Sequence, residues 1–236
     1  MIRFNNVSKK YSSHLALANV TVEIPSGEFV FLIGPSGAGK TTFLRLLIRD
    51  ILPTTGTIHV DDLDLSRLPG SHIHKLRRKI GTVFQDFKLL TDRTVFENVA
   101  LGLEILGKQD KEIRTRVFDV LELVGLSDKK NSFPRELSYG EMQRTSIARA
   151  IVGGPTILLA DEPTGNLDPD TADEILDILS EINRIGTTVI MATHNATIVN
   201  EFKKRTLSLH EGRLVSDEAK GRYHVSGKTK HVRSKG

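Results

Sequence analysis

Short apolar runs alternate with segments of helical periodicity along this chain of 236 residues. Three runs have the length of strands: Phe29–Ile33, Ile157–Ala160 and Thr188–Thr193. They do not alternate between apolar and polar residues, as a strand with one solvent-exposed face would, so they are expected to be buried on both faces. Helical spacing is strongest at Thr41–Arg49 and after Asp168–Pro169, an N-cap followed by proline at the first helical position. Buried strands that alternate with helices predict an α/β fold with a largely parallel sheet.

Both ends of this pattern carry further strands. The N-terminal part predicts short strands at Ile2–Phe4 and Ala18–Ile24, with a turn at Pro25–Gly27 before the first apolar run. Near the other end, Arg205–Leu209 and Arg213–Val215 predict a hairpin around Glu211-Gly212.

The middle of the chain has helical periodicity and lacks buried strand runs. It includes predicted helices at Asp110–Leu123 and Tyr139–Ile151. We therefore expect one domain over residues 1–218, made of a core (1–86 and 155–218) and an inserted helical subdomain (87–154). Residues 219–236 are expected to form a basic, flexible tail.

Composition narrows the class of protein. Hydrophobic residues make up 39% of the chain and charged residues 26%, as in ordinary globular domains. No apolar run approaches the roughly 18–20 residues that cross a membrane, and the first residues lack the pattern of a signal peptide. With no cysteine, the chain suits a reducing compartment. We expect a cytoplasmic protein whose membrane contact comes through a partner or its surface.

Positive charge is concentrated at the C-terminal end. The 33 basic and 29 acidic residues give a net charge of +4, but six basic residues and no acid follow Ala219. The preceding residues therefore carry a net charge of −2, which argues against nucleic acid as a ligand of the folded body. The tail is expected either to remain solvated or to contact anionic lipid.

A phosphate-binding loop is the most specific motif. Backbone N–H groups of such a glycine-rich loop surround phosphate oxygens, the lysine reaches the outer phosphates, and the hydroxyl that follows binds Mg²⁺. The motif stands between an apolar strand run and a helix, as this function requires; a glycine turn that binds nothing is the alternative. The predicted ATP-binding residues are Gly34, Pro35, Ser36, Gly37, Ala38, Gly39, Lys40, Thr41 and Thr42.

Acidic and histidine residues follow two later strands. Asp161 and Glu162 end the run at Ile157, and His194 follows the run at Thr188–Thr193. Carboxyl ends of parallel strands meet at the ligand-binding edge of α/β sheets. We predict that Asp161 holds Mg²⁺, that Glu162 polarises the attacking water, and that His194 contacts the γ-phosphate. Solvated acids at a strand end and a loop histidine are the plainer alternatives.

Further motifs resemble the family of ABC ATPases. Leu137-Ser-Tyr-Gly-Glu141 is similar to the family's signature sequence, Gln85 to its Q-loop glutamine, and Gly165–Asp168 to its D-loop. The resemblance covers about residues 1–218 and implies a phosphate-loop core with a mostly parallel sheet, an N-terminal antiparallel part and an inserted helical subdomain. It also implies that Tyr11 stacks on adenine, that Gln85 contacts Mg²⁺ and nucleotide, and that Lys40, Glu162 and His194 are catalytic.

The signature sequence departs from the family's usual form at two positions. Tyr139 stands where glycine is commonest, and Glu141 where glutamine is common. The two positions that contact ATP in the family, Ser138 and Gly140, are present, and the family implies that they and Asp168 act on the opposite subunit. Ser138 and Asp168 also suit ordinary helix caps, so the two interpretations are compatible. We expect tyrosine at position 139 to affect the rate of ATP turnover and not the class of the protein.

Three longer runs, Phe29–Gly39, Val83–Leu90 and Asp161–Asp168, are similar to the cell-division branch of the family. This resemblance implies a homodimer formed on ATP binding and a polytopic membrane partner that docks near Gln85–Thr91. It further implies control of cell-wall hydrolysis from the cytoplasmic face of the membrane. Two alternatives stay open: the ATPase of a lipoprotein-release or macrolide exporter, and a soluble ABC protein acting on DNA or ribosomes. The second usually needs two nucleotide domains or a long insertion.

Overall fold

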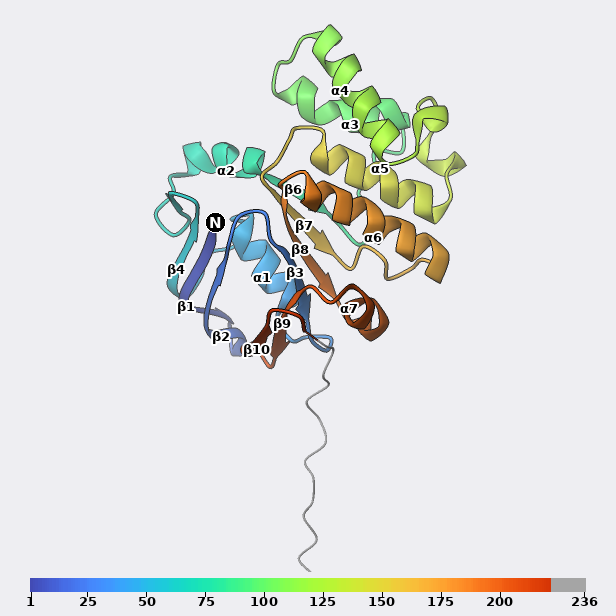
Figure 1. Ribbon diagram of the computed structural model, residues 1–236. Coiled ribbons are helices and arrows are strands. Elements are labelled where there is room, and N and C mark those ends of the chain that lie inside the picture. Colours follow the sequence, from blue (N-terminus) through green and yellow to red (C-terminus); the bar gives the residue numbers. More distant parts are fainter. Residues whose placement is uncertain (222–236) are drawn as a thin grey trace, which may run out of the picture.

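The computed structural model describes residues 1–221, which form two sheets and their covering helices (Figure 1). The larger sheet has six strands in the order β10-β9-β3-β8-β7-β6, and only the β10–β9 pair is antiparallel. Its strands are β3 (Phe29–Ile33), β6 (Ile80–Val83), β7 (Ile157–Asp161), β8 (Thr188–Thr193), β9 (Arg205–His210) and β10 (Arg213–Glu218). The predicted α/β class with a mostly parallel sheet is confirmed.

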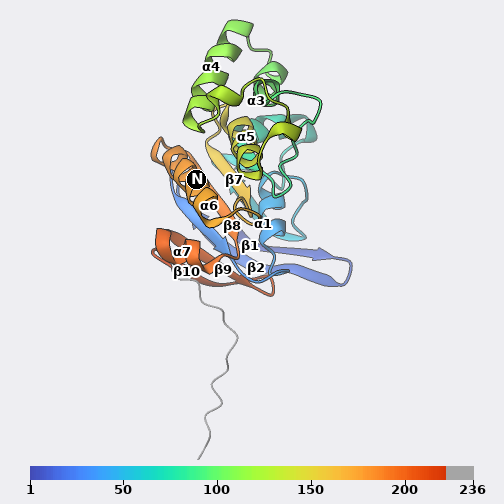
Figure 2. The same cartoon turned by 90° about the vertical axis from the view of Figure 1, so that its right-hand side faces the viewer.

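The smaller sheet is antiparallel, with β1 (Ile2–Tyr11) between β2 (His14–Ile24) and β4 (Thr55–Val60), and with the short β5 (Leu63–Asp64) at its edge. The first two strands are much longer than the predicted ones. Their register shifts several times, and they continue to the turn between Tyr11 and His14. Figure 2 shows the resulting hairpin projecting from the body of the molecule.

Apolar cores lie on both faces of the large sheet, because successive side chains of a strand point to opposite sides. In β3, Phe29, Phe31 and Ile33 pack into the core that contains the helical segment. Val30 and Leu32 pack into the other core, with the antiparallel sheet. This arrangement explains why β3 is apolar at every position.

Among the described residues, four α-helices lie outside the segment between β6 and β7, and each comes after a strand in the sequence. They are α1 (Lys40–Leu47), α2 (Ile73–Lys79), α6 (Pro169–Arg184) and α7 (Ala196–Phe202), with 3₁₀ turns at η1 (Gly70–His72), η2 (Ser127–Lys129) and η3 (Pro134–Glu136). Asp168 caps α6 by accepting a hydrogen bond from the N–H of Thr171 at 3.0 Å, as its sequence position predicted.

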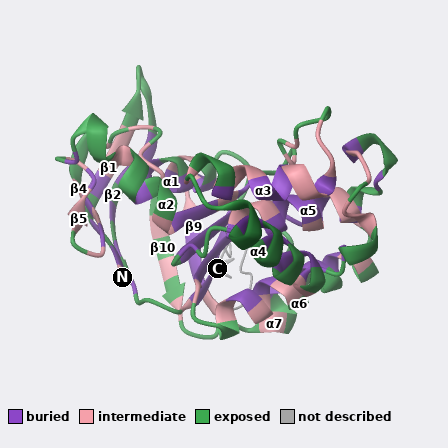
Figure 3. Ribbon diagram, turned by 90° about the horizontal axis from the view of Figure 1, so that it is seen from above, coloured by how far each residue is buried: buried purple, intermediate pink, exposed green. Residues whose placement is uncertain are grey.

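Between β6 and β7 the chain forms α3 (Val95–Ile105), α4 (Asp110–Leu123) and α5 (Tyr139–Ile151), which lie together at the top of Figure 1. Helix α5 is the central one and packs against α3, α4 and α6. Viewed from above, α5 carries much buried surface, whereas α4 is largely exposed (Figure 3).

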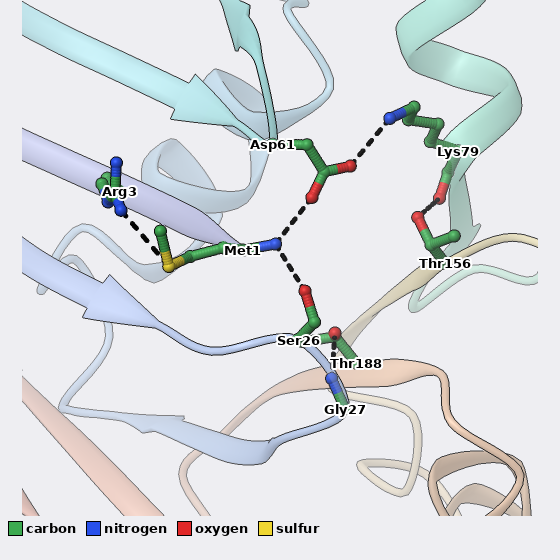
Figure 4. A network of polar contacts seen from close by, with 8 residues as sticks. All are labelled: Met1, Arg3, Ser26, Gly27, Asp61, Lys79, Thr156 and Thr188. Carbon is green, nitrogen blue, oxygen red and sulfur yellow. Dashed lines mark hydrogen bonds and ion pairs between the residues drawn. The ribbon is translucent and has the colours of Figure 1, made fainter.

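A polar network joins the start of the chain to the rest of the core (Figure 4). The α-amino group of Met1 donates to Ser26 Oγ and to Asp61 Oδ1, both at 2.6 Å. The other Asp61 oxygen accepts from Lys79 Nζ at 2.7 Å. The network therefore ties β1 and α2 to the turn after β4.

Among residues 1–221, no helix is long and apolar enough to cross a membrane. The flexible tail predicted for residues 219–236 lies almost entirely outside the described part of the chain, which stops at Gly221.

Candidate nucleotide-binding site

Four neighbouring parallel strands bring the predicted motifs to one edge of the large sheet. The phosphate loop follows β3, His194 follows β8, the acidic pair ends β7, and Gln85 lies two residues after β6. In sheet order these strands are β3, β8, β7 and β6, so motifs scattered over 160 positions of sequence end at one edge. Such a carboxyl edge is where open α/β sheets bind ligands.

The phosphate loop depends on glycine for two different reasons. At Gly39 (φ 108°) an added Cβ would come 2.6 Å from the carbonyl oxygen of Ala16, so the loop packs tightly on β2. At Gly37 (φ 78°) an added Cβ would meet nothing within 4 Å, yet the left-handed backbone disfavours a side chain. The loop borders a cavity of about 270 Å³, lined by Tyr11, His14, Ala16, Ser36, Gly37, Ala38, Gly39, Lys40, Thr41 and Thr42.

Lys40 is buried at the start of α1 and folds back over its own loop. Its Nζ donates to the carbonyl of Gly34 at 2.7 Å, and it lies 3.7 Å from Glu162 Oε1. A buried ammonium at a helix N-terminus, beside the free N–H groups of the first turn, makes the cavity strongly attractive to phosphate.

The Thr41 hydroxyl and the Asp161 carboxylate meet although 120 positions separate them in sequence. Thr41 Oγ1 donates to Asp161 Oδ2 at 3.1 Å. Burial raises the pKa of Asp161, and the hydrogen bond from Thr41 only partly opposes this. A cation bound beside Asp161 would lower the free-energy cost of burying its charged carboxylate.

The donor set fits Mg²⁺. Among the described residues, no group of three or more histidine and acidic side chains could hold a metal alone. Mg²⁺ typically takes one or two carboxylates with substrate phosphates and water, which the pair of Thr41 and Asp161 can complete. The bound ion would supply positive charge to the phosphate oxygens.

Glu162 adopts a left-handed backbone conformation, with φ 50°, which is unusual for a residue other than glycine. Neighbouring side chains of a strand normally point to opposite faces of the sheet. The left-handed conformation at Glu162, directly after the end of β7, interrupts this alternation. Asp161 therefore reaches Thr41 while Glu162 approaches Lys40. Such strain is often found at functional sites.

His194 also contacts the Glu162 carboxylate. Its Nδ1 lies 2.9 Å from Glu162 Oε1, and its backbone N–H donates to Oε2 at 3.4 Å. Lys40, Glu162 and His194 thus form one connected group beside the phosphate loop. A single group of this kind can bind phosphate and position a water molecule.

A second group of predicted residues lies apart from the first. Ser138 caps α5, and its hydroxyl accepts from the N–H of Glu141, whose carboxylate accepts in return from the N–H of Ser138. These bonds hold the pKa of Glu141 below its usual value. An added Cβ at Gly140 would lie 2.5 Å from Thr171 Cγ2, so the starts of α5 and α6 are in close contact.

The second group therefore contains Ser138, Gly140 and Asp168. In the part of the chain that the structure describes, no hydrogen bond or ion pair joins these three residues to the phosphate loop. Gln85 is exposed two residues after β6, at the sheet edge where the first group lies. Tyr11 lines the cavity beside the phosphate loop.

Sequence reasoning missed the contacts that fix the segment after Gln85. Phe87 and Lys88 both have left-handed backbones, and Arg149 of α5 donates to their carbonyl oxygens at 2.7 and 2.6 Å. Burial without an acidic partner lowers the pKa of Arg149. The Phe87 ring also meets Tyr139 edge to face, with centroids 5.8 Å apart. Arginine within the apolar end of a helix was the only signal that could have indicated this role.

Comparisons with known proteins agree with this geometry. Residues 17–165 match the family described as ABC transporter. The cell division ATP-binding protein FtsE of Mycobacterium tuberculosis is 53% identical, with 94% of this chain and 98% of the relative covered. FtsE of Bacillus subtilis is 52% identical over the same shares. The chain belongs to the FtsE group of the ABC transporter family.

Solved structures place this FtsE-group chain among ABC cassettes. A dimeric, post-hydrolysis structure of the ATP-binding cassette MJ0796, bound to ADP and Pi, has a TM-score of 0.85 at 36% identity, covering 94% of this chain and all of the other. The family resemblance drawn from the sequence motifs is confirmed, and with it an ATPase that uses ATP with Mg²⁺.

Proposed function

We propose that this chain converts ATP binding into dimerisation and passes the change to a polytopic membrane protein of the FtsX type, and so controls cell-wall hydrolysis during division. The observation that carries the proposal is the separation of two groups of site residues within one chain. The group at the phosphate loop has the chemistry for hydrolysis, while Ser138 and Gly140 present a helix N-terminus elsewhere.

A second copy supplies the missing contact. The start of α5 is an anion site because its first N–H groups and its dipole favour negative charge. Placed over the phosphate loop of another copy, Ser138 and Gly140 would meet the γ-phosphate, and the arrangement would repeat by two-fold symmetry. Two ATP molecules would then be held between the copies, so ATP would stabilise the dimer by mass action. MJ0796, a structural neighbour, is dimeric.

The catalytic roles follow from the first group. Glu162 polarises the attacking water, His194 orients Glu162 and contacts the γ-phosphate, and Lys40 binds the outer phosphates. Thr41, Asp161 and Gln85 complete the surroundings of Mg²⁺, and Tyr11 stacks on adenine. Asp168, at the start of α6, acts across the dimer interface.

The membrane partner contacts the segment Gln85–Thr91. Arg149 fixes this segment to α5, so a change at Gln85 on nucleotide binding moves both the segment and the helical residues 87–154 that we treat as one subdomain. The relatives support a cell-division role because they are named cell division ATP-binding proteins. The chain then works at the cytoplasmic face of the membrane.

Sedimentation and co-purification test this function. The Glu162→Gln variant should sediment as a dimer with Mg-ATP and as a monomer without nucleotide. An FtsX-type protein expressed with the chain should be retained by wild type, and the Phe87→Ala and Leu89→Ala variants should lose it. A monomer at saturating Mg-ATP, or retention of the partner by both variants at the wild-type level, would contradict the proposal.

The basic tail adds a weaker contact with anionic lipid. Each basic residue held near such a surface contributes about 1 kcal/mol. Deleting residues 226–236, which hold four of the six basic residues, should reduce binding to phosphatidylglycerol vesicles and leave ATPase activity unchanged. High salt should remove the difference. Equal vesicle binding by both proteins would exclude this role.

A further inference from the structure

The turn between β9 and β10 is partly buried, although hairpin turns usually lie on the surface. It consists of two residues, Glu211 and Gly212, because His210 pairs with Arg213 on either side of it. Both residues have left-handed backbones, with φ 48° and 75°, as a tight hairpin turn requires. Glu211 is exposed, but Gly212 is buried. The turn therefore packs against the body of the molecule through its second residue.

Gly212 joins the phosphate loop to β2. Its N–H donates to the carbonyl oxygen of Ala38 at 3.1 Å, and its own carbonyl accepts from the N–H of Ala18 at 2.8 Å. Ala38 belongs to the phosphate loop, and Ala18 belongs to β2. An added Cβ at Gly212 would come 2.8 Å from the carbonyl oxygen of Ala16, so this position has no room for a side chain. One residue of the hairpin thus bridges two elements beside the nucleotide cavity.

Strand β9 supports the beginning of the same loop. An added Cβ at Gly34 would overlap the carbonyl of Leu209, near the end of β9. The other end of the loop, at Gly39, packs on Ala16 of β2. Strand β10 also lies beside β2 (Figure 2). The phosphate loop is therefore held between the β9–β10 hairpin and β2.

The bond from Gly212 fixes the direction of one peptide unit in the phosphate loop. The carbonyl and the N–H of a trans peptide point in opposite directions. With the carbonyl of Ala38 held by Gly212, the N–H of Gly39 in the same peptide unit points away from the turn. Glycine tolerates both signs of φ, so a peptide beside Gly39 can rotate easily. A rotated peptide would present a carbonyl oxygen where phosphate requires an N–H donor.

We propose that Gly212 is a positioning residue for nucleotide binding, which acts through Ala38 to keep the N–H of Gly39 directed at phosphate. The inference rests on the proposed function, which assigns this loop to the phosphates of ATP, and adds a residue outside the predicted nucleotide-binding motifs. A tight turn needs glycine at this position, which is the plainer explanation of Gly212. That need accounts for its φ but not for its burial or for the two bonds that leave the hairpin.

Gly212→Ala tests the proposal, because its Cβ would force the turn away from Ala16 and so break the bond to Ala38. Gly125→Ala is the matched control: Gly125 has φ 66°, yet an added Cβ would meet nothing within 4 Å. Mg-ADP is the probe, since the N–H groups of such a loop surround the α- and β-phosphates. We expect the Kd of a fluorescent ADP analogue to rise about 10-fold or more in Gly212→Ala, as for loss of one hydrogen bond to a charged group. In Gly125→Ala it should stay within about twofold of wild type.

Steady-state ATP hydrolysis separates positioning from catalysis. The proposed bond is present before and during hydrolysis alike, so its loss in Gly212→Ala should raise KM about as much as Kd and change kcat less than about twofold. Urea titrations establish the conditions under which each variant is fully folded, and the assays are run there. A fall in kcat with KM unchanged would overturn the inference.

Amide hydrogen exchange of the wild-type protein is a second test that needs no variant. Coupling between two sites is reciprocal, so if the Gly212 bond favours nucleotide, nucleotide must favour the bond by the same factor. Mg-ADP should therefore slow exchange of the Gly212 N–H about 10-fold or more. The Gly125 N–H, which donates to the carbonyl of Glu122 at 3.1 Å, should exchange at an unchanged rate.

Three results would overturn the inference: an unchanged Kd in folded Gly212→Ala, equal rises in the two glycine variants, or exchange of the Gly212 N–H that does not respond to Mg-ADP. If Gly212→Ala does not fold, the exchange measurement decides alone. Lys40→Ala separates the inference from the proposed function. Wild-type affinity of Lys40→Ala for Mg-ADP would show that the loop does not hold the phosphates, so the proposed function itself would fail. Weak binding by Lys40→Ala with normal binding by Gly212→Ala would remove only the inference.

Discussion

The rings of Phe87 and Tyr139 meet edge to face across 5.8 Å, and so join the segment that follows Gln85 to the first residue of α5. Tyr139 occupies the position in the signature sequence where the family most often has glycine. Tyr139 is 59% exposed, yet its ring still packs against another side chain of the same molecule, Phe87. The residue that departs from the family pattern, Tyr139, therefore makes a contact within its own chain.

A double-mutant cycle measures this contact. Aromatic pairs contribute about 0.5–1.5 kcal/mol, and the exposure of Tyr139 places this pair near the lower value. Phe87→Ala, Tyr139→Ala and the double variant should give a coupling of about 0.5 kcal/mol in the free energy of unfolding, from urea titrations. Tyr139→Phe keeps the ring and should keep the coupling. Additive effects of the two alanine substitutions would show that the rings do not stabilise each other.

Glu162→Gln should separate ATP binding from hydrolysis. The amide keeps the size of the side chain but cannot accept a proton, so phosphate release should slow by roughly 10²–10⁴-fold while ATP still binds. Glu122→Gln, the same change on the exposed face of α4, should hydrolyse ATP as wild type does. Lys40→Ala should weaken nucleotide binding itself, measured by fluorescent ATP titration. Wild-type turnover in Glu162→Gln would exclude its role as the base.

Asp161→Asn should stabilise the nucleotide-free protein while removing its response to Mg²⁺. Burial raises the pKa of Asp161 above its unfolded value, so at neutral pH the ionised carboxylate opposes folding, and this penalty fades only as the pH falls through the folded pKa. Asparagine can still accept the bond from Thr41. We expect the melting temperature without nucleotide to be unchanged or up to about 4 °C higher.

Differential scanning calorimetry with and without Mg-ATP checks both halves of that expectation. Wild type should gain stability from Mg-ATP, and Asp161→Asn should gain much less. Thr41→Ser, which keeps the hydroxyl, serves as the control and should respond to Mg-ATP. A nucleotide-free Asp161→Asn protein that melted well below wild type would contradict the assignment of a burial penalty.

Asp61 should contribute to stability only above the acid range. The hydrogen bond from Lys79, and then the one from the α-amino group of Met1, hold the pKa of Asp61 below its usual range. Its contribution is therefore present above about pH 4 and is lost as the pH falls through the lower folded pKa. The side chain is 31% exposed, so solvent screening limits the contribution to less than about 1 kcal/mol.

Urea titrations of Asp61→Asn at a series of pH values check the sign. The variant should be less stable than wild type at pH 7, and the difference should shrink toward low pH. The neighbouring Asp62→Asn is the matched control, since Asp62 is exposed and forms no ion pair in the described residues; it should show no such trend. A difference that grew on acidification would reverse the assignment.

The sequence predicted best those elements whose pattern of apolar residues is contained within the element itself. Phe29–Ile33 and Thr188–Thr193 match β3 and β8, because a strand buried on both faces is apolar at nearly every position. Helix α4 has the predicted bounds, with its apolar residues at helical spacing. The residues of the phosphate loop were likewise recognisable, because that motif is continuous in sequence.

Strand β6 shows why other parts were not predicted. Its sequence, Ile-Gly-Thr-Val, contains a glycine that disfavours a strand, yet an added Cβ at Gly81 would come 2.4 Å from the carbonyl oxygen of Ala150. The need for glycine thus arises from the close approach of α5, which no local pattern reveals. The left-handed turn at Glu162 and the bonds from Arg149 depend in the same way on tertiary contacts.

The order of strands in the large sheet also matters while the chain is being made. Within residues 1–221, strand β3, which precedes the phosphate loop, pairs only with β8 and β9, and β8 begins 155 residues after β3 ends. At about 5–20 residues per second, synthesis of that interval takes roughly 8–30 s. During this time five consecutive apolar residues have no strand partner, so the ribosome-bound chain should depend on chaperones, and ATP cannot assist its folding until nearly all of it has emerged.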